Sequence, residues 1–296
     1  MKKGIATITV CLLAVSAIAG KVQITDEDTG TVAPVTSEGL AITLPTVAQV
    51  PFLIAVAQGN VSGYSSVNKF GNNPTTDSGD TVWGGDGVYA FFPTNAQTVS
   101  VVSASTNDTA AGTGARTAIF YGLDANWAEI NETVTLNGTT PVALTNQYIR
   151  MFRGVVLTAG TNNNNVGALS VTNGAGTVAI YIAADDGQTQ HSVYTIPAGK
   201  SGYFVKGYVG VSDGGNASSR ESVRFQWQTK PNNGVNGAWA VKGEIECIND
   251  GSGWWQYEYG IPAGVLPEKT DIRIVAKEAS TQLGTVGGFD LLLVDN

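Results

Sequence analysis

The stretch Ser222-Val-Arg-Phe-Gln-Trp-Gln228 alternates apolar and polar side chains without a break. Successive side chains of an extended chain point to opposite faces, which places Val223, Phe225 and Trp227 together on one face. β-Branched and aromatic residues are also typical of strands. The pattern therefore predicts an antiparallel strand with an apolar face in a core and a polar face toward solvent.

The same period of two persists from residue 96 to the end of the chain. The expected strands are 97–105, 116–123, 132–138, 147–158, 167–172, 176–184, 190–197, 201–212, 221–229, 238–248, 253–261, 270–278 and 286–294. Asn137-Gly138 and Asn173-Gly174 are typical of hairpin turns. Such spacing predicts an all-β fold with two stacked antiparallel β-sandwich or jelly-roll-like domains, 95–186 and 187–296, and one large jelly roll is the alternative.

Residues 21–94 are expected to form an extended arm and a loop-rich lead-in. Pro34, Pro45 and Pro51 would interrupt any strand ladder in the arm. Turn residues fill the stretch that follows, from 62 to 93. Aromatic side chains in this stretch are expected to hold the loop against a sheet: Trp83, Tyr89, Phe91 and Phe92.

The composition supports a packed β protein. Apolar residues make up 43% of the 296 residues and charged residues only 14%, whereas long solvent-facing helices need many charges. The 37 glycines suit tight turns. A formal net charge of −8 argues against a nucleic-acid partner, because a phosphate backbone requires clustered Lys and Arg.

The first twenty residues have the layout of a secretory signal peptide. Lys2 and Lys3 precede an apolar run, and Ala17-Ile18-Ala19 resembles a cleavage site. The alternative is that residues 1–20 are retained as an apolar anchor. Cys11 lies in this run and Cys247 in a strand-like stretch, so no disulfide is expected between them.

The residue types needed for catalysis are scarce, and we expect no enzyme, no cofactor and no metal centre. The single histidine, His191, is expected to be a surface residue, and Cys247 a buried inert thiol. A glycosidase pair of Asp124 with Glu129 or Glu132 is compatible with the spacing, but these residues lie in a polar turn.

Two acidic turns are the only candidates for a cation site. Asp26-Glu27-Asp28 and Asp185-Asp186 could supply oxygen ligands for Ca²⁺. Neither has the spacing of an EF-hand loop, and acidic turns are mostly just solvated.

One aromatic strand is the candidate contact surface for a ligand or a partner. In the stretch 254–259 the alternation places Trp255, Tyr257 and Tyr259 on one face and Trp254 on the other. One of these faces must enter the core, and the other leaves aromatic rings near the surface, where they often contact carbohydrates or proteins. Burial of Trp254 under a loop is the competing interpretation.

Several stretches resemble a family of virion structural proteins from marine tailed bacteriophages. They are Val56–Gly71, Thr81–Tyr89, Asn107–Arg116, Tyr121–Val134, Tyr194–Tyr203, Leu266–Arg273 and Gly288–Asn296. The similarity spans about residues 21–296.

The resemblance implies a non-enzymatic part of the particle, in the head decoration, a head fibre or the tail. Its partners would be copies of itself and other virion proteins, and possible further partners are host surface glycans or receptors. A signal-like segment at residues 1–20 is unexpected in a virion protein. The alternative is therefore a secreted or cell-surface β-sandwich protein that binds carbohydrate or a receptor.

Overall fold

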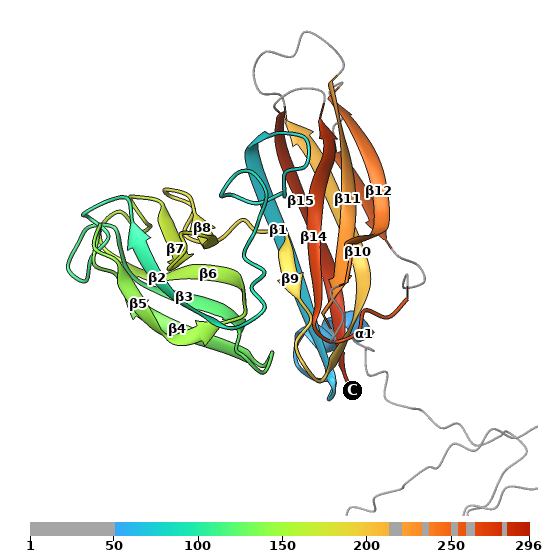
Figure 1. The fold of residues 1–296 in the computed structure, drawn as a ribbon, viewed down its shortest axis with the longest axis horizontal. Coiled ribbons are helices and arrows are strands. Elements are labelled where there is room, and N and C mark those ends of the chain that lie inside the picture. The colour runs from blue at the N-terminus through green and yellow to red at the C-terminus, as the bar shows by residue number, and fades with distance from the viewer. Residues whose placement is uncertain (1–50, 213–220, 233–236, 250–253, 259–263, 280–282) are drawn as a thin grey trace, which may run out of the picture. The chain divides into compact units, whose positions relative to one another are not determined.

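The computed structural model describes residues 51–212, 221–232, 237–249, 254–258, 264–279 and 283–296 (Figure 1). These residues form fifteen strands in four antiparallel sheets and one short helix, α1 (Phe52–Ala57). The expected all-β fold is confirmed. The expected arm over residues 21–50 and the segment 1–20 lie outside the described residues.

The smaller sandwich is built from seven consecutive strands. They are β2 (Gln97–Ser103), β3 (Ala115–Leu123), β4 (Glu129–Thr135), β5 (Val142–Tyr148), β6 (Arg150–Ala159), β7 (Leu169–Asn173) and β8 (Val178–Ile182). One sheet has the order β5-β2-β7-β8 and the other the order β4-β3-β6. Phe120, Tyr148 and Ile180 are fully buried in the core between them.

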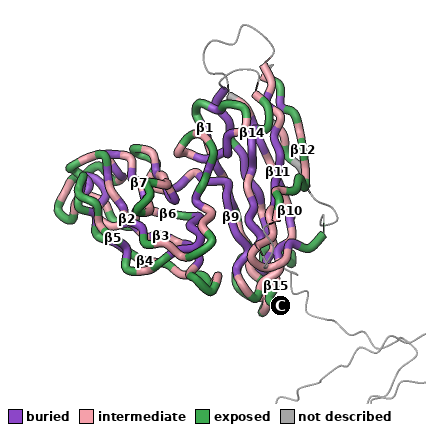
Figure 2. Tube along the Cα trace, in the orientation of Figure 1, coloured by how far each residue is buried: buried purple, intermediate pink, exposed green. Residues whose placement is uncertain are grey.

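The larger sandwich combines one early strand with the whole C-terminal part of the chain. Its strands are β1 (Tyr64–Thr76), β9 (Val193–Thr195), β10 (Lys200–Ser212), β11 (Glu221–Pro231), β12 (Ala240–Asn249), β13 (Trp254–Glu258), β14 (Thr270–Ala279) and β15 (Leu283–Asp295). The sheet orders are β1-β15-β10-β13 and β12-β11-β14-β9. Buried residues recur along these strands (Figure 2).

Strand β11 contains the stretch on which the fold prediction rests. Val223, Phe225 and Trp227 are buried in the core of the larger sandwich, as expected. Its polar face is only partly open to solvent, however, since Gln226 and Gln228 are buried while Arg224 is partly exposed. Gln228 donates a hydrogen bond to the Gln226 side-chain oxygen at 2.8 Å, and its own oxygen accepts from Arg273. Paired amides can be buried because their polar atoms remain hydrogen-bonded.

Strand β1 is a part of the fold that the sequence pattern did not predict. It pairs with β15 over its whole length, from Tyr64 opposite Val294 to Thr76 opposite Leu283. Its asparagines, Gly71 and Pro74 are residues that strands usually avoid. The pairing shifts register next to Pro74, which has no N–H to donate to a ladder. The lead-in thus completes the larger sandwich, with the smaller one inserted between β1 and β9.

Two turn predictions have opposite outcomes. Asn173-Gly174 joins β7 and β8 in a hairpin, where the Asn173 side chain accepts hydrogen bonds from the backbone of Ala175 and Thr177. The predicted hairpin at Asn137-Gly138 is wrong, because β4 pairs with β3 whereas β5 pairs with β2. That turn links the two sheets, and the strand expected over 147–158 is divided at residue 149 between β5 and β6.

The aromatic residues of the lead-in hold its loop on the smaller sandwich, as expected. Trp83, Tyr89 and Phe91 are buried in that core, and Phe92 packs against it. The Tyr89 hydroxyl lies 3.1 Å from the carbonyl oxygens of both Met151 and Ala179. The loop is therefore fixed by ring packing and by a polar contact at the end of the ring.

The expected surface position of His191 is wrong. Its side chain is buried, with its ring 4.5 Å from that of Tyr89 and 5.5 Å from that of Trp83. Neither ring nitrogen has a hydrogen-bond partner among the described residues. Burial, and then the positive charge of Lys69, hold the pKa of His191 well below its ordinary value. The neighbouring glutamines suggested exposure, but the aromatic loop covers the residue.

His191 should weaken the fold in mild acid. The unfolded chain binds a proton at His191 below about pH 6.5 and the folded chain does not, so the free energy of unfolding falls by about 1.4 kcal/mol per pH unit below that value. We expect His191→Phe to remove this slope, and urea unfolding at pH 7.5, 6.5 and 5.5 measures it. Because the chain has one histidine, an equal slope in both proteins would contradict this assignment.

A buried ion pair connects the two sandwiches. Arg150, at the start of β6, donates to the Asp271 carboxylate of β14 through two nitrogens, at 2.7 and 2.9 Å. Asp271 also accepts from Thr195 at 2.8 Å and from Asn232 at 2.7 Å. The guanidinium lies 4.7 Å from the ring centroid of Trp127. Both charges are thus removed from water but fully hydrogen-bonded, which is the condition under which a buried pair is tolerated.

Removal of one partner should be costly, because it leaves the other charge buried without compensation. We expect Asp271→Asn to lower the free energy of unfolding by about 3 to 5 kcal/mol. The matched control is Asp295→Asn, which breaks the exposed pair with Lys200 and should cost less than about 1 kcal/mol. Chemical denaturation of both variants tests this. Equal decreases in the free energy of unfolding would show that the buried pair stabilises the fold no more than the exposed pair does.

Candidate functional site

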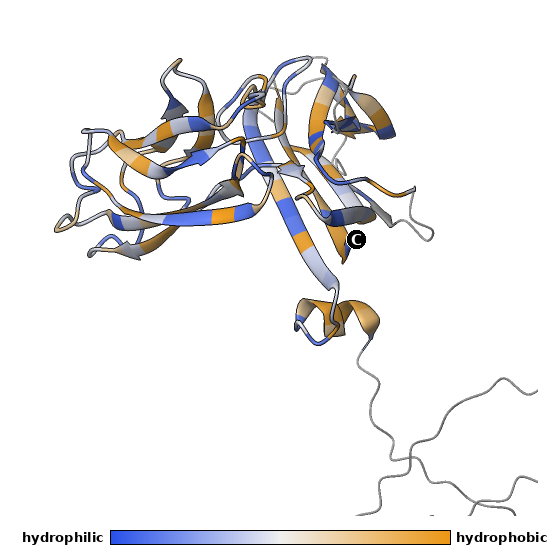
Figure 3. Cartoon of the chain, turned by 60° about the horizontal axis from the view of Figure 1, so that its bottom comes forward, coloured by the Kyte–Doolittle hydropathy of each residue, from blue (hydrophilic) through white to orange (hydrophobic). Residues whose placement is uncertain are grey.

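A short apolar helix provides the first candidate surface. Helix α1 has the sequence Phe-Leu-Ile-Ala-Val-Ala and begins after Pro51, whose carbonyl oxygen accepts its first hydrogen bonds. Phe52, Leu53 and Ile54 are 50%, 48% and 50% exposed, although hydrophobic side chains of this size are usually covered. The Phe52 ring contacts the half-exposed ring of Tyr64 edge-on at 5.3 Å. We call these four residues the basal patch. Figure 3 shows helix α1 in the colour of hydrophobic residues.

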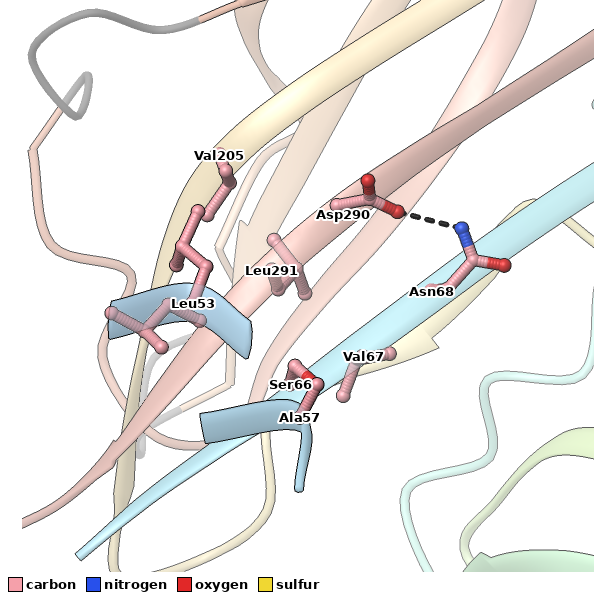
Figure 4. Close-up of a pocket in the computed structure, with 9 residues that line it drawn as sticks. Leu53, Ala57, Ser66, Val67, Asn68, Val205, Asp290 and Leu291 are labelled. Atoms are coloured by element: carbon pink, nitrogen blue, oxygen red, sulfur yellow. Dashed lines mark hydrogen bonds between the residues drawn. The ribbon is translucent and has the colours of Figure 1, made fainter. Parts of the chain in front are cut away.

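A small cavity lies beside the basal patch, between α1 and the sheet that contains β1, β15 and β10 (Figure 4). Its volume is about 270 Å³. Apolar side chains make up most of its lining: Leu53, Ala57, Val67, Val205, Leu291 and Leu292. A hydrogen bond of 2.6 Å from Asn68 to Asp290 lies at its polar side. The cavity adds apolar surface to the basal patch.

The sequence contained a signal for this surface. A run of six apolar residues follows Pro51, but the prolines of the lead-in suggested an irregular arm. The exposure of the run depends on what surrounds it, which the local sequence does not encode.

A larger groove lies where the two sandwiches meet, and we call it the junction groove. Its volume is about 470 Å³, within the usual size range of small-molecule sites. Strands β1, β3, β4, β6 and β9 contribute its lining, which includes Asn68, Lys69, Ile119, Tyr121, Glu129, Phe152, Arg153, Val155, Leu157 and Tyr194.

Lys69 is the unusual residue of the junction groove. Only 6% of it is exposed, and its ammonium group donates a hydrogen bond to the carbonyl oxygen of Phe152. Burial, and then the charge of Arg153, lower the pKa of Lys69 to about 7. Lysine has three N–H donors when protonated, so this one bond leaves a poorly solvated charge. Strand β1 was not expected, and therefore Lys69 was not predicted as a site residue.

The strand of candidate contact residues, Trp254, Trp255, Tyr257 and Tyr259, is partly placed. Strand β13 pairs with β10 from Trp254 opposite Gly210 to Glu258 opposite Lys206. Trp255 is half-buried against the core of the larger sandwich, with its ring 6.5 Å from that of Trp227. Tyr259 and the side chains of Trp254 and Tyr257 lie outside the described residues, so an exposed aromatic surface there stays a prediction.

The acidic residues considered for catalysis contact backbone groups. The Asp124 carboxylate accepts hydrogen bonds from the backbone of Asn126 and Ala128. Glu132 accepts from the backbone of Thr145 and Asn146 at 2.7 and 2.8 Å. The Asp124 carboxylate thus organises a turn in the way that short polar side chains commonly do, whereas Glu132 lies in strand β4 and connects it to the backbone of strand β5.

The remaining candidates carry no recognisable site in the described ranges. Cys247 is buried, as expected, and its burial raises the thiol pKa to about 11, which disfavours the reactive thiolate. The Asp186 carboxylate accepts from Gln190, and the described residues contain no group of three potential metal ligands. Asp26-Glu27-Asp28 lies outside the described residues. Within those same ranges, α1 is too short to cross a membrane and no longer apolar helix is present.

Asp108 organises the stretch Asn107–Arg116. Its fully buried carboxylate accepts hydrogen bonds from the Ser103 hydroxyl and from the backbone of Ala115, Val166 and Gly167. A Cβ atom at Gly114 would lie 2.1 Å from the Asp108 carboxylate. This stretch therefore has a structural role, because the Asp108 carboxylate joins the loop between β2 and β3 to the loop between β6 and β7.

Comparisons with known proteins return no match. No protein-family model, no curated protein and no solved structure is similar to this chain. The resemblance to virion proteins therefore stays a prediction based on the stretches themselves.

Proposed function

We propose that this chain is a non-enzymatic structural protein of a tailed-bacteriophage particle, where multiple copies assemble through the basal patch. The observation that carries the proposal is the exposure of Phe52, Leu53 and Ile54 on one short helix. Contiguous exposed apolar residues on a soluble protein commonly mark an interaction surface.

The energy available at this surface suits repeated contacts between copies. Full burial of a Leu, Ile or Phe side chain contributes about 1.5 to 3 kcal/mol, so covering the exposed half of each contributes about 1 kcal/mol. The adjacent cavity, with the partly exposed Leu292 and Val205 in its lining, offers further apolar area to a neighbour. Contacts that are weak one by one become effective when many identical subunits repeat them in a symmetric assembly.

The remaining support comes from the sequence. A low share of charged residues and two well-filled β cores suit a rigid building element. From the resemblance to virion proteins we infer that the chain assembles on the particle, in the head decoration, a head fibre or the tail.

Charge placed in the basal patch should prevent assembly. We expect the full-length chain to form oligomers whose mass rises with concentration in sedimentation velocity runs, and Leu53→Asp with Ile54→Asp to sediment as a monomer. Val88→Asp is the matched control, because Val88 is a 57% exposed apolar residue outside the patch. A wild-type chain that stays monomeric at all concentrations, or a control that dissociates equally, would contradict the proposal.

The place of assembly needs its own experiment. Particles purified by density gradient from the source culture should contain this chain, and its intact mass should equal that of a chain that starts at Met1. Recovery of the chain only from the cell envelope or the medium, with the mass of a chain that starts near Lys21, would instead support the alternative of a secreted or cell-surface protein.

A further inference from the structure

The junction groove concentrates positive charge in an acidic protein. The chain has 24 acidic and 16 basic residues, yet the groove contains Lys69 and Arg153 against one acid, Glu129. Neither cation forms an ion pair with a carboxylate in the described parts of the chain, whereas Arg150, Lys200 and other cations do. An anionic group bound in the groove would give these two side chains the partner that they lack.

The two cations differ in how they could meet an anion. Arg153 is exposed, and within the described residues its guanidinium donates one long hydrogen bond, of 3.4 Å, to the Gln188 side chain, so its planar fork is available for a carboxylate. Lys69 is nearly covered and donates to the Phe152 carbonyl oxygen. A negative charge next to Lys69 would offset the cost of burying its ammonium group.

The wall next to Arg153 is apolar and aromatic. In the β3–β6 pairing, Tyr121 lies opposite Arg153 and Ile119 lies opposite Val155, so all four side chains share one face of the sheet. Leu157, two residues further along β6, is 50% exposed. Sugar rings pack their C–H faces against such surfaces, and a charged group at one edge then fixes their orientation.

Polar groups complete the groove on the opposite side. Glu129 is exposed and lies 3.4 Å from the Tyr194 hydroxyl, and Asn68 and Ser66 come from the edge strand β1. These groups can accept or donate hydrogen bonds to sugar hydroxyls. The carboxylate of Glu129 would repel a polyanion such as nucleic acid, which favours a ligand with few charges.

We propose that the junction groove binds an acidic saccharide, with its carboxylate at Arg153 and Lys69 and its sugar ring against Tyr121 and Leu157. The inference goes beyond the assembly function, because it gives each copy in an assembly a binding site of its own for a charged surface glycan.

Calorimetric titration of the full-length chain at pH 6.5 tests the ligand class. We expect trigalacturonic acid to bind at least tenfold more tightly than maltotriose, a neutral trimer of similar size. Arg153→Gln should weaken trigalacturonic acid binding at least tenfold. Arg224→Gln, which removes a cation from the distant surface of β11, should leave binding unchanged. Equal affinity for maltotriose, equal affinity for inorganic phosphate, or no effect of Arg153→Gln would overturn the proposal.

Proton uptake gives a second measurement that depends on Lys69. An anion beside Lys69 favours its charged form, so binding at pH 8 should take up protons, and the measured heat should change with the ionisation enthalpy of the buffer. Lys69→Met preserves the length and the apolar stem of the side chain and should abolish this uptake. Uptake that persists in Lys69→Met would exclude the assigned role. The other titratable groups around Lys69 are Tyr121, Glu129, Arg153, His191, Tyr194 and Asp290.

The saccharide site and the assembly surface can fail independently. Arg153→Gln should sediment like the wild-type chain, and the Leu53→Asp, Ile54→Asp variant should still bind trigalacturonic acid. A variant that loses both assembly and saccharide binding would show that the two surfaces are not separate. The assignment of a binding site to each copy would then be wrong.

Discussion

The ion pair between Arg150 and Asp271 is the constraint on which the junction of the two sandwiches depends. A buried Arg–Asp pair is stable only when every remaining donor and acceptor is satisfied, and here Thr195 and Asn232 complete the carboxylate. The pair joins the first residue of β6 to β14, and β6 then supplies Phe152 and Arg153 to the junction groove. The geometry of the groove thus depends on contacts that neither sandwich could make alone, among them this ion pair, the hydrogen bond from Lys69 to the Phe152 carbonyl oxygen and the packing of the Phe152 ring against Tyr194.

Burial of polar groups distinguishes this protein from a simple alternating β-sandwich. Asp108 is satisfied by four hydrogen bonds, and the Gln226–Gln228–Arg273 ladder pairs its own amides and guanidinium. His191 and Lys69 differ from these residues, because burial lowers the pKa of each and their side chains have few or no partners. Incompletely satisfied groups cost stability and cluster at functional sites, and Lys69 is such a group in the lining of the junction groove.

The candidate surfaces show which kinds of site a sequence reveals. The aromatic strand around Trp255 could be recognised in the sequence because its residues are adjacent in the chain, yet Trp255 packs against the core of the larger sandwich. Lys69 and Arg153 lie 84 positions apart in the numbering, and nothing in either local stretch connects them. They meet because β1 and β6 both border the groove, which is a consequence of long-range pairing.

The amino-acid sequence by itself determined the class of fold and most of its strands. The alternation in Ser222–Gln228 and the turn at Asn173-Gly174 are local, and a period of two specifies an extended chain whatever surrounds it. Only the tertiary structure decided that Asn137-Gly138 links two sheets, that β1 pairs with β15 and that His191 is buried. The physical reason is that periodicity states which residues share a face, whereas the choice of partner strand depends on packing between segments far apart in the chain.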